Sequence, residues 1–281
     1  MAILSQLILY PIKSCAGMEV TEAVATVSGL SAQGVHDREW MLVTPEGQFL
    51  TQREYPRMAT IVPRVERASL VVTAPGMAEL QLPLAQRAGV PTVRVQIWDD
   101  VVDAADCGNA AAAWFAEALG APCRLVRFPP GLERPTSEKW TGGAPSCARF
   151  ADAYPLLLIG AAALDEINAR LLAAGREALP MNRFRPNLVS EGTDPFEEDY
   201  TESLRAGDVL VKPVKPCARC PIPAVDQATG IPGPDPLDVL QSWRSKAILD
   251  GAVCVGMNCI VADGAGGVLR VGQELDIALS F

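Results

Sequence analysis

The sequence predicts a mainly β fold with a few helices (α+β), organised as an N-terminal β-barrel-like domain followed by a second β-barrel domain. Short runs of β-branched and other apolar residues recur along the chain, and turns rich in glycine, proline and charged residues separate them. Only a few segments place apolar residues at helical spacing. Many short strands joined by tight turns are typical of barrels and sandwiches, which is why we expect this architecture.

Residues 3–126 are predicted to be mostly β. The alanine-rich segment Asn109–Leu119 is the clear helix of this half, with Asp106 or Asn109 as a candidate N-cap and Gly120 at the C′ position. The strands expected here are Ile3–Leu9, Val20–Val27, Trp40–Val43, Ala59–Val65, Leu70–Thr73 and Val93–Ile97.

A stretch rich in proline, glycine and serine follows at residues 128–147. This composition is typical of a linker or a long loop, so we expect a domain boundary here. The predicted domains are residues 1–128 and residues 129–281.

Beyond residue 147 the pattern again predicts strands with a few helices. An amphipathic helix is expected at Ala161–Ala174, because Leu164, Ile167 and Leu171 recur on one side. A second helix is expected at Leu237–Lys246, after an Asp-Pro pair. The expected strands are Pro155–Ile159, Phe184–Val189, Val253–Val261 and Val268–Ile277.

Composition excludes several classes of function. The formal net charge of −9 argues against nonspecific binding to nucleic acid or to anionic membranes. No apolar run approaches the roughly 20 residues of a membrane helix, and the first residues lack the basic region of a signal peptide. The eight cysteines are too scattered for a disulfide-stapled scaffold, so we expect a reducing, cytoplasmic location. His36 is the only histidine, which excludes His-rich metal sites.

The segment 212–230 presents two cysteines, Cys217 and Cys220, on either side of Arg219. We expect a strand at Asp208–Val211 to lead into a rigid loop here, since prolines deny this segment a regular helix. Cations favour thiolate over thiol, and the sequence places Arg219 together with Lys212 and Lys215 near the sulfur atoms. A reactive cysteine and a pair of buried structural thiols both remain consistent with this pattern.

Basic residues occur in short segments that do not resemble solvated helix faces, namely Lys13 beside Ser14, Arg38, Arg53, and Arg185 close to Asn187. Arginine beside proline and asparagine at a strand edge suits bidentate recognition of phosphate or carboxylate. Each residue alone also fits simple surface solubility. Together they predict one local cationic pocket for an anionic ligand.

Other cofactor and metal patterns are weak or absent. There is no P-loop, no dinucleotide-binding glycine motif and no ferredoxin cysteine run. The C-x-x-C pair lacks a second pair for zinc and does not start a helix as a thioredoxin-type dithiol would. Asp152 is expected either to bind a ligand or to cap a turn, and the acidic segment 197–199 is expected to be solvated.

At this point the motifs resemble a known family. YPIKSCAG, HDREW and TQREYPRM in the first half resemble the N-terminal β-barrel of MOSC-domain proteins, and RFADAYPLLL, NRFRPNLV, KPCARC and VDQATG resemble the MOSC domain itself. The motifs occur in the family's order over nearly the whole chain. Within this family the motifs resemble those of the bacterial YcbX-like proteins and the mitochondrial amidoxime-reducing component, which are molybdenum-cofactor enzymes that reduce N-hydroxylated compounds.

The resemblance implies roles for individual residues. Cys220 would be the catalytic residue and the protein thiolate on molybdenum, and a soft thiolate suits such a metal. Cys217 is not the expected ligand. The residues implied to hold the cofactor, a molybdopterin carrying molybdenum, are Lys13, Ser14, Arg38, Asp152, Arg185, Asn187 and Arg219.

The sequence departs from the family at the candidate site. Ala153 and Tyr154 stand where the mitochondrial proteins carry hydroxyl residues, which fits the bacterial branch better. Ala218 stands where serine is usual, so one hydrogen bond to the cofactor would be lost. Pro221-Ile222-Pro223 replaces the usual aliphatic and hydroxyl residues and would reshape the substrate side of the pocket.

The function implied is a molybdenum-dependent reductase of small N-hydroxylated substrates such as hydroxylamines, amidoximes and N-hydroxylated bases. No Fe–S cluster or flavin is expected in this chain, so a separate donor of the ferredoxin or flavin-reductase type would deliver the electrons. Neither a nucleic-acid nor a membrane partner is expected. Two alternatives remain: a sulfur-carrier protein with a Cys220 persulfide, and a non-catalytic carrier of the cofactor.

Overall fold

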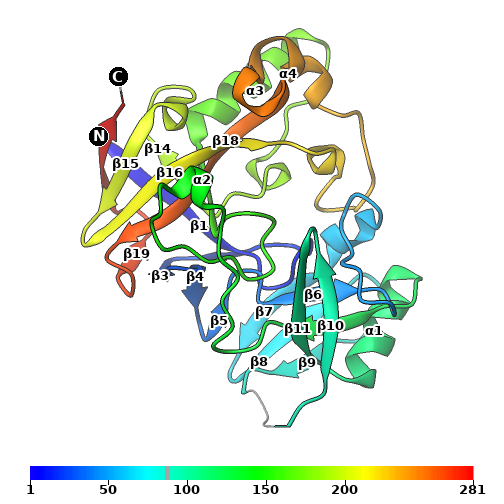
Figure 1. The fold of residues 1–281 in the computed structure, drawn as a ribbon. Helices are drawn as coiled ribbons and strands as arrows, with labels where there is room; N and C mark the ends of the chain where they lie inside the picture. The colour runs from blue at the N-terminus through cyan, green and yellow to red at the C-terminus, as the bar shows by residue number, and fades with distance from the viewer. Residues whose placement is uncertain (86–88, 281) are drawn as a thin grey trace.

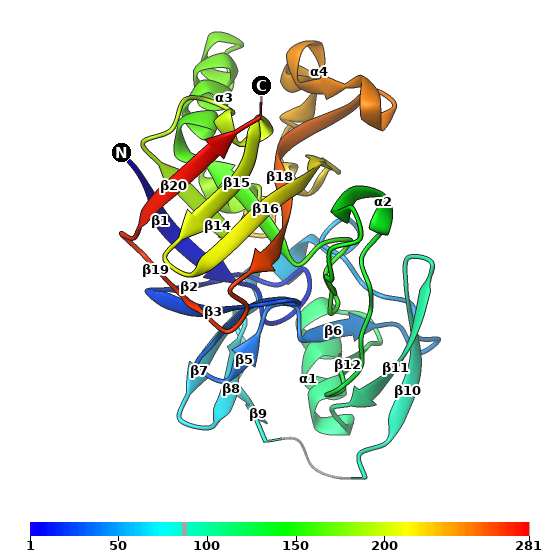
Figure 2. The ribbon, with the colours of Figure 1, turned by 60° about the vertical axis from the view of Figure 1, so that its left-hand side comes forward.

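The computed structural model describes residues 1–85 and 89–280 and confirms a mainly β fold with four α-helices among them (Figures 1 and 2). The helices are α1 (Asn109–Leu119), α2 (Glu138–Thr141), α3 (Ala161–Ala173) and α4 (Leu237–Arg244). None of the helices in this part of the chain is long and apolar enough to span a membrane.

Seven strands close into a barrel, which forms the upper part of the molecule in Figures 1 and 2. Neighbouring strands are antiparallel except for the parallel pair β13–β14, and the pairing of β18 with β13 closes the ring. Two short strands attach to it, β2 (Met18–Val20) to β1 and β17 (Ser245–Lys246) to β18. In order around the ring, the strands are β13 (Leu156–Gly160), β14 (Leu188–Glu191), β1 (Ala2–Leu9), β20 (Glu274–Leu279), β15 (Thr201–Ala206), β16 (Val209–Ala218) and β18 (Ala252–Asp263).

Three smaller sheets and α1 form the lower part of the molecule (Figure 2). One sheet joins β10 (Thr92–Ile97), β11 (Asp100–Asp106), β12 (Arg124–Arg127) and β6 (Trp40–Val43). The next joins β7 (Val62–Glu66), β8 (Ser69–Thr73) and β9 (Leu80–Pro83). The last joins β19 (Val268–Arg270), β3 (Glu22–Thr26), β4 (Gly29–Ala32) and β5 (Val35–His36).

The two halves exchange strands. β1, from the start of the chain, lies in the barrel between β14 and β20, while β19, from near its end, pairs with β3. One buried apolar cluster also continues through both halves and includes Leu7, Trp40, Phe115, Leu156 and Met257. The domain boundary near residue 128 therefore remains a prediction. Strands from each side of residue 128 pair with strands from the other side.

Helix α1 occupies the predicted residues, but its capping differs from the expectation. Gly108 is the N-cap, and neither predicted residue caps the helix with its side chain. The Asp106 carboxylate instead accepts a hydrogen bond from the Gly108 N–H and pairs with Arg124. Gly120 does end the helix, with φ of 70°, as the C′ position requires.

Strand β16 is longer than predicted. The sequence suggested that the strand would stop at Val211 and a loop would follow, but pairing with β18 continues to Ala218. Register shifts occur at Pro213 and at Pro216, and β15 pairs only as far as Val211. Proline is tolerated in a strand at bulges and where one edge is unpaired, which explains why these residues did not end it.

The expected strand Val268–Ile277 is instead divided into β19 and β20, which belong to different sheets. Two further expectations for the second half are also wrong. The segment expected to be extended from Phe184 begins as strand only at Leu188, because Arg185 adopts a left-handed conformation with φ of 57°. The acidic segment 197–199 is not solvated. Glu198 is buried, and Asp199 forms ion pairs with Arg244 and Lys246 at 2.9 and 2.7 Å.

Candidate functional site

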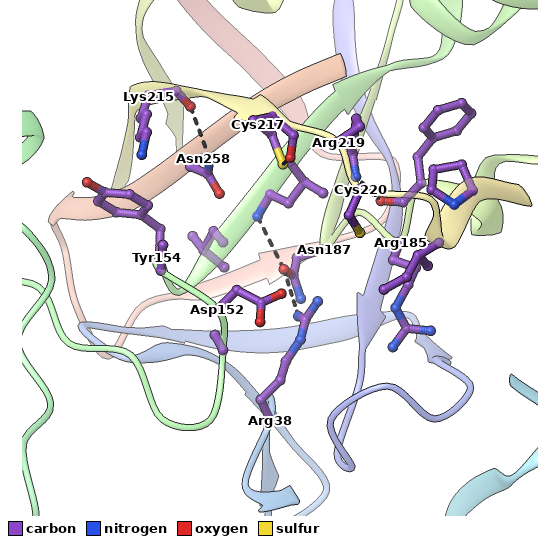
Figure 3. Close-up of a pocket in the computed structure, with 18 of the residues that line it drawn as sticks. Arg38, Asp152, Tyr154, Arg185, Asn187, Lys215, Cys217, Arg219, Cys220 and Asn258 are labelled. Carbon is purple, nitrogen blue, oxygen red and sulfur yellow. Dashed lines mark hydrogen bonds between the residues drawn. The ribbon is translucent and has the colours of Figure 1, made fainter. Parts of the chain in front are cut away.

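One pocket collects the eight residues to which the family resemblance gave a role, and six of them are labelled in Figure 3. Its cavity measures about 250 Å³. Separate parts of the chain supply the eight: the segment after β1 (Lys13, Ser14), the turn before β6 (Arg38), the segments before β13 and β14 (Asp152, Arg185, Asn187), and the end of β16 with the residues after it (Arg219, Cys220). The predicted cationic pocket is therefore present, while the role of each residue stays a prediction.

Backbone conformation around the pocket is unusual. Ser14, Arg38 and Arg185 line it with φ of 64°, 47° and 57°, and Trp98, which donates a hydrogen bond to the lining residue Asp152, has φ of 54°. Residues other than glycine rarely adopt positive φ, and such positions cluster at functional sites where surrounding structure holds them. The fold thus holds several pocket side chains in place at a cost in backbone energy.

Two of the arginines stack on one buried tyrosine. The guanidinium carbons of Arg38 and Arg185 lie 4.4 and 4.3 Å from the centre of the Tyr10 ring. Arg185 also donates to the Cys15 carbonyl at 2.7 Å. The electron-rich ring stabilises both cations, and both arginines line the pocket, where an anion would be attracted. Burial raises the pKa of the Tyr10 hydroxyl to about 12, so it stays neutral.

Asn187 and the buried Asp37 fix the position of Arg38. The Asn187 carbonyl oxygen accepts from Arg38 and from the Leu157 N–H, at 3.0 and 3.2 Å. Its amide nitrogen donates to Asp37, which also forms an ion pair with Arg38. Both polar atoms of the Asn187 side chain therefore form hydrogen bonds within the protein. Arg38 is held by its ion pair with Asp37 and by its hydrogen bond to Asn187.

Lys13 and Asp152, which both line the pocket, form an ion pair. Lys13 is buried and also donates to the Phe150 carbonyl at 3.0 Å, while the Trp98 indole donates to Asp152 at 3.0 Å. The surrounding pocket walls disfavour a charged carboxylate, but Lys13 and the hydrogen bonds from Lys13 and Trp98 outweigh them and hold the pKa of Asp152 below its usual range. Asp152 is therefore an acceptor at neutral pH.

The cysteine segment is held by two arginines. Arg219 donates to the Val255 carbonyl at 2.7 and 3.0 Å and to the Phe184 carbonyl at 2.8 Å. Arg183 donates to the Ala224 carbonyl and forms an ion pair with Asp226 at 2.7 Å. Both therefore fix the backbone that carries Cys220.

The expected thiolate-stabilising cations are only partly present. Arg219 and Lys215 line the pocket, whereas Lys212 is exposed on β16 and does not. Cys217 and Cys220 both line it, and burial raises the pKa of Cys217, which Arg219 opposes. In residues 1–85 and 89–280 no three His, Cys, Asp or Glu side chains gather as a metal site.

Sequence reasoning gave no pocket role to Arg183 or Asn258, which line the wall together with Tyr154 and Lys215. Arg53, which was expected to join the cationic pocket, does not line it but lies 4.9 Å over the Trp98 ring. Their positions depend on which strands pair: Asn258 faces Lys215 only because β18 is the partner of β16. No local pattern could have indicated this.

Comparison with known families matches both halves of the chain. Residues 1–122 match the MOSC N-terminal beta barrel domain, and residues 146–276 match the MOSC domain. All eight predicted site residues fall within these two ranges.

Curated relatives match over most of their length. The human mitochondrial amidoxime reducing component 2 is 36% identical over 244 residues, which cover 85% of this chain and 72% of the relative. The human component 1 is 32% identical over 244 residues, with 85% and 71% covered, and the rat component 2 is 34% identical over 282 residues, with 96% and 82% covered. The chain therefore belongs to the family that joins a MOSC N-terminal β-barrel domain to a MOSC domain, together with the mitochondrial amidoxime-reducing components.

Proposed function

We propose that this protein is a molybdenum-cofactor oxidoreductase that reduces N-hydroxylated compounds. The observation that carries the proposal is the single pocket in which the Cys220 thiol lies with Lys13, Arg38 and Arg185, in a chain whose relatives are named for amidoxime reduction. The family assignment supports a molybdenum cofactor, and the names of the relatives support a reductase.

The donor set fits the proposed cofactor. Molybdopterin is anionic, and the arginine pair on Tyr10 would hold its phosphate by charge-assisted hydrogen bonds. Cys220 would supply one soft thiolate ligand to a metal that brings its other ligands with it. When bound, the cofactor would supply the two-electron redox chemistry.

The reaction would convert an N–OH group to N–H, consuming two electrons and two protons and releasing water. Burial lowers the pKa of Lys13, which makes its Nζ a better proton donor than that of an exposed lysine. Asp152, as a carboxylate, would orient donor groups and would not supply a proton. We further propose that a separate donor of the ferredoxin or flavin-reductase type delivers the electrons and that the protein works in the cytoplasm.

The proposal is tested by measuring bound molybdenum, by plasma mass spectrometry, in protein from a host that loads other molybdoenzymes. We expect near-stoichiometric metal in the wild type, its loss in Cys220→Ala, and its retention in the matched variant Cys217→Ala. Reduction of benzamidoxime should fall by at least a hundredfold in Cys220→Ala, because the thiolate ligand is removed.

Other results would overturn the proposal. Full activity in Cys220→Ala with molybdenum still bound would reject Cys220 as the ligand. Metal-free wild type that gains a persulfide from a cysteine desulfurase would establish sulfur transfer instead. Loaded wild type that turns over no N-hydroxylated substrate with any artificial donor would indicate a cofactor carrier.

A further inference from the structure

The labelled pocket residues separate into two groups. In Figure 3, Arg38, Asn187, Arg185, Arg219 and Cys220 gather on one side. Tyr154, Lys215 and Asn258 lie on the other, with Cys217 and Asp152 between them. An anionic cofactor is attracted to the first side because three guanidinium groups line it, which leaves the second side for a substrate.

Asn258 presents a hydrogen-bond acceptor on that second side. Its amide nitrogen donates to the backbone carbonyls of Lys215 and Pro216 at 3.3 and 3.5 Å. Carbonyl oxygens only accept, so the nitrogen must face β16 and the carbonyl oxygen must face away from it. Figure 3 shows this oxygen directed away from Lys215 and into the pocket. The orientation of the amide is thus determined by the strand beside it.

The groups near Asn258 suit a planar ligand that carries N–H donors. The buried Tyr154 supplies an aromatic wall, and Asp152 supplies a second acceptor that is already ionised. Lys215, the cation on this side, has its ammonium group 5.4 Å from the centre of the Trp140 ring. An N-hydroxyamidine is planar, and its NH₂ group lies beside the N–OH group.

We propose that Asn258 determines substrate specificity by accepting a hydrogen bond from the NH₂ group next to the N–OH group, so that N-hydroxyamidines are favoured over N-hydroxylated compounds without this donor. The inference rests on the proposed function and assigns to Asn258 the selection among N-hydroxylated substrates. A site that hydrogen-bonds a substrate N–H rejects an analogue lacking it, since its polar group is then left unpaired. Asn258 would be a specificity residue, with no part in the redox step.

The test compares two matched compounds, benzamidoxime and its N,N-dimethyl analogue, which keeps the N–OH group but has no NH₂ donor. Their binding to the oxidised, cofactor-loaded protein is measured by calorimetry without an electron donor, so no turnover occurs. We expect the wild type to bind benzamidoxime at least tenfold more tightly. In Asn258→Leu, affinity for benzamidoxime should fall about tenfold, with that for the dimethyl analogue unchanged.

Turnover of the same pair gives a second readout. In Asn258→Leu, KM for benzamidoxime should rise while kcat stays close to the wild-type value, because the lost contact is made with the ground state as well as the transition state. Lys212→Ala is the matched control, since Lys212 lies on β16 but outside the pocket and should leave both compounds unaffected.

Two results would overturn the inference: equal losses for both compounds, which would mean that Asn258 only supports β16, or no loss for either. These results differ from failure of the proposed function. A wild type that binds benzamidoxime selectively through Asn258 but never reduces it would reject the reductase and keep the binding role. A wild type that reduces both compounds equally well would support the reductase and reject the specificity role of Asn258.

Discussion

At the scale of single residues, Glu198 has an environment that its sequence context does not suggest. It lies in a run of three acidic residues, yet it is 3% exposed, and the backbone N–H groups of Glu198 itself and Gly160 offset the cost of its burial only in part. Burial raises the pKa of Glu198 to about 7. The carboxyl group is therefore stable in the fold mainly when it carries a proton.

This predicts stability that depends on pH. The unfolded chain releases the Glu198 proton near pH 4.5 and the folded chain near pH 7, so the fold loses stability as pH rises between these values. Glu198→Gln removes the titration, and its free energy of unfolding should exceed that of the wild type by about 3 kcal/mol at pH 8. Near pH 4.5 the two proteins should be alike.

Denaturant unfolding at pH 5 and pH 8 measures this difference. Glu202→Gln serves as the control, because Glu202 is exposed on the neighbouring β15 and its replacement should change stability little at either pH. If Glu198→Gln raised the free energy of unfolding by the same amount at pH 5 and at pH 8, the proposed titration of Glu198 would be wrong.

At the scale of elements, β18 contains a bulge in its pairing with β16, next to the residues that pair with β13. Pro216 pairs with Met257 and Ala218 with Cys254, so two steps along β16 correspond to three along β18. Gly256 lies within this bulge with φ of 74°, as a left-handed bulge position requires. A Cβ there would lie 2.6 Å from the Leu158 carbonyl oxygen of β13.

Gly256→Ala should therefore destabilise the protein strongly, by about 3 kcal/mol or more, since backbone strain and a backbone clash act together where the barrel closes. Gly251→Ala is the matched control: Gly251 also has positive φ, but a Cβ would meet nothing within 4 Å. It should cost only about 1–2 kcal/mol. Equal shifts of the two melting temperatures would show that the clash is relieved without cost.

At the scale of the whole molecule, the barrel is incomplete without the start of the chain. Because β1 supplies the strand between β14 and β20, residues 129–281 alone would expose two unpaired strand edges. That fragment should show no cooperative thermal transition by circular dichroism. The predicted boundary at residue 128 would then separate sequence motifs but not independent folding units.

A permuted fragment provides the control for this prediction. Ala2 of β1 pairs with Leu275 of β20, so residues 1–28 can be joined through a short linker after Leu279 in hairpin geometry. Both termini lie on the barrel, in the upper part of the molecule in Figures 1 and 2. The permuted fragment should regain a cooperative transition, whereas cooperative melting of residues 129–281 alone would contradict the role of β1.

Local composition and spacing were sufficient to predict the mainly β class, the positions of α1 and α3, and a cationic pocket that contains Lys13, Arg38 and Arg185. They were sufficient because short apolar runs, a helical period and arginine beside proline each act over a few neighbouring residues. The resemblance of the motifs to the MOSC family predicted an N-terminal barrel domain followed by a MOSC domain. The family matches confirm this order.

Only the tertiary structure decided what depends on contacts between distant segments. Pairing with β18 continued β16 beyond its prolines and placed Asn258 opposite Lys215. The fold also buried Glu198 and placed β1 within the seven-stranded barrel. In each case the partner lies far away along the chain, so no local propensity contains the information. The sequence by itself therefore determined which chemistry is present, and strand pairing determined where each group faces.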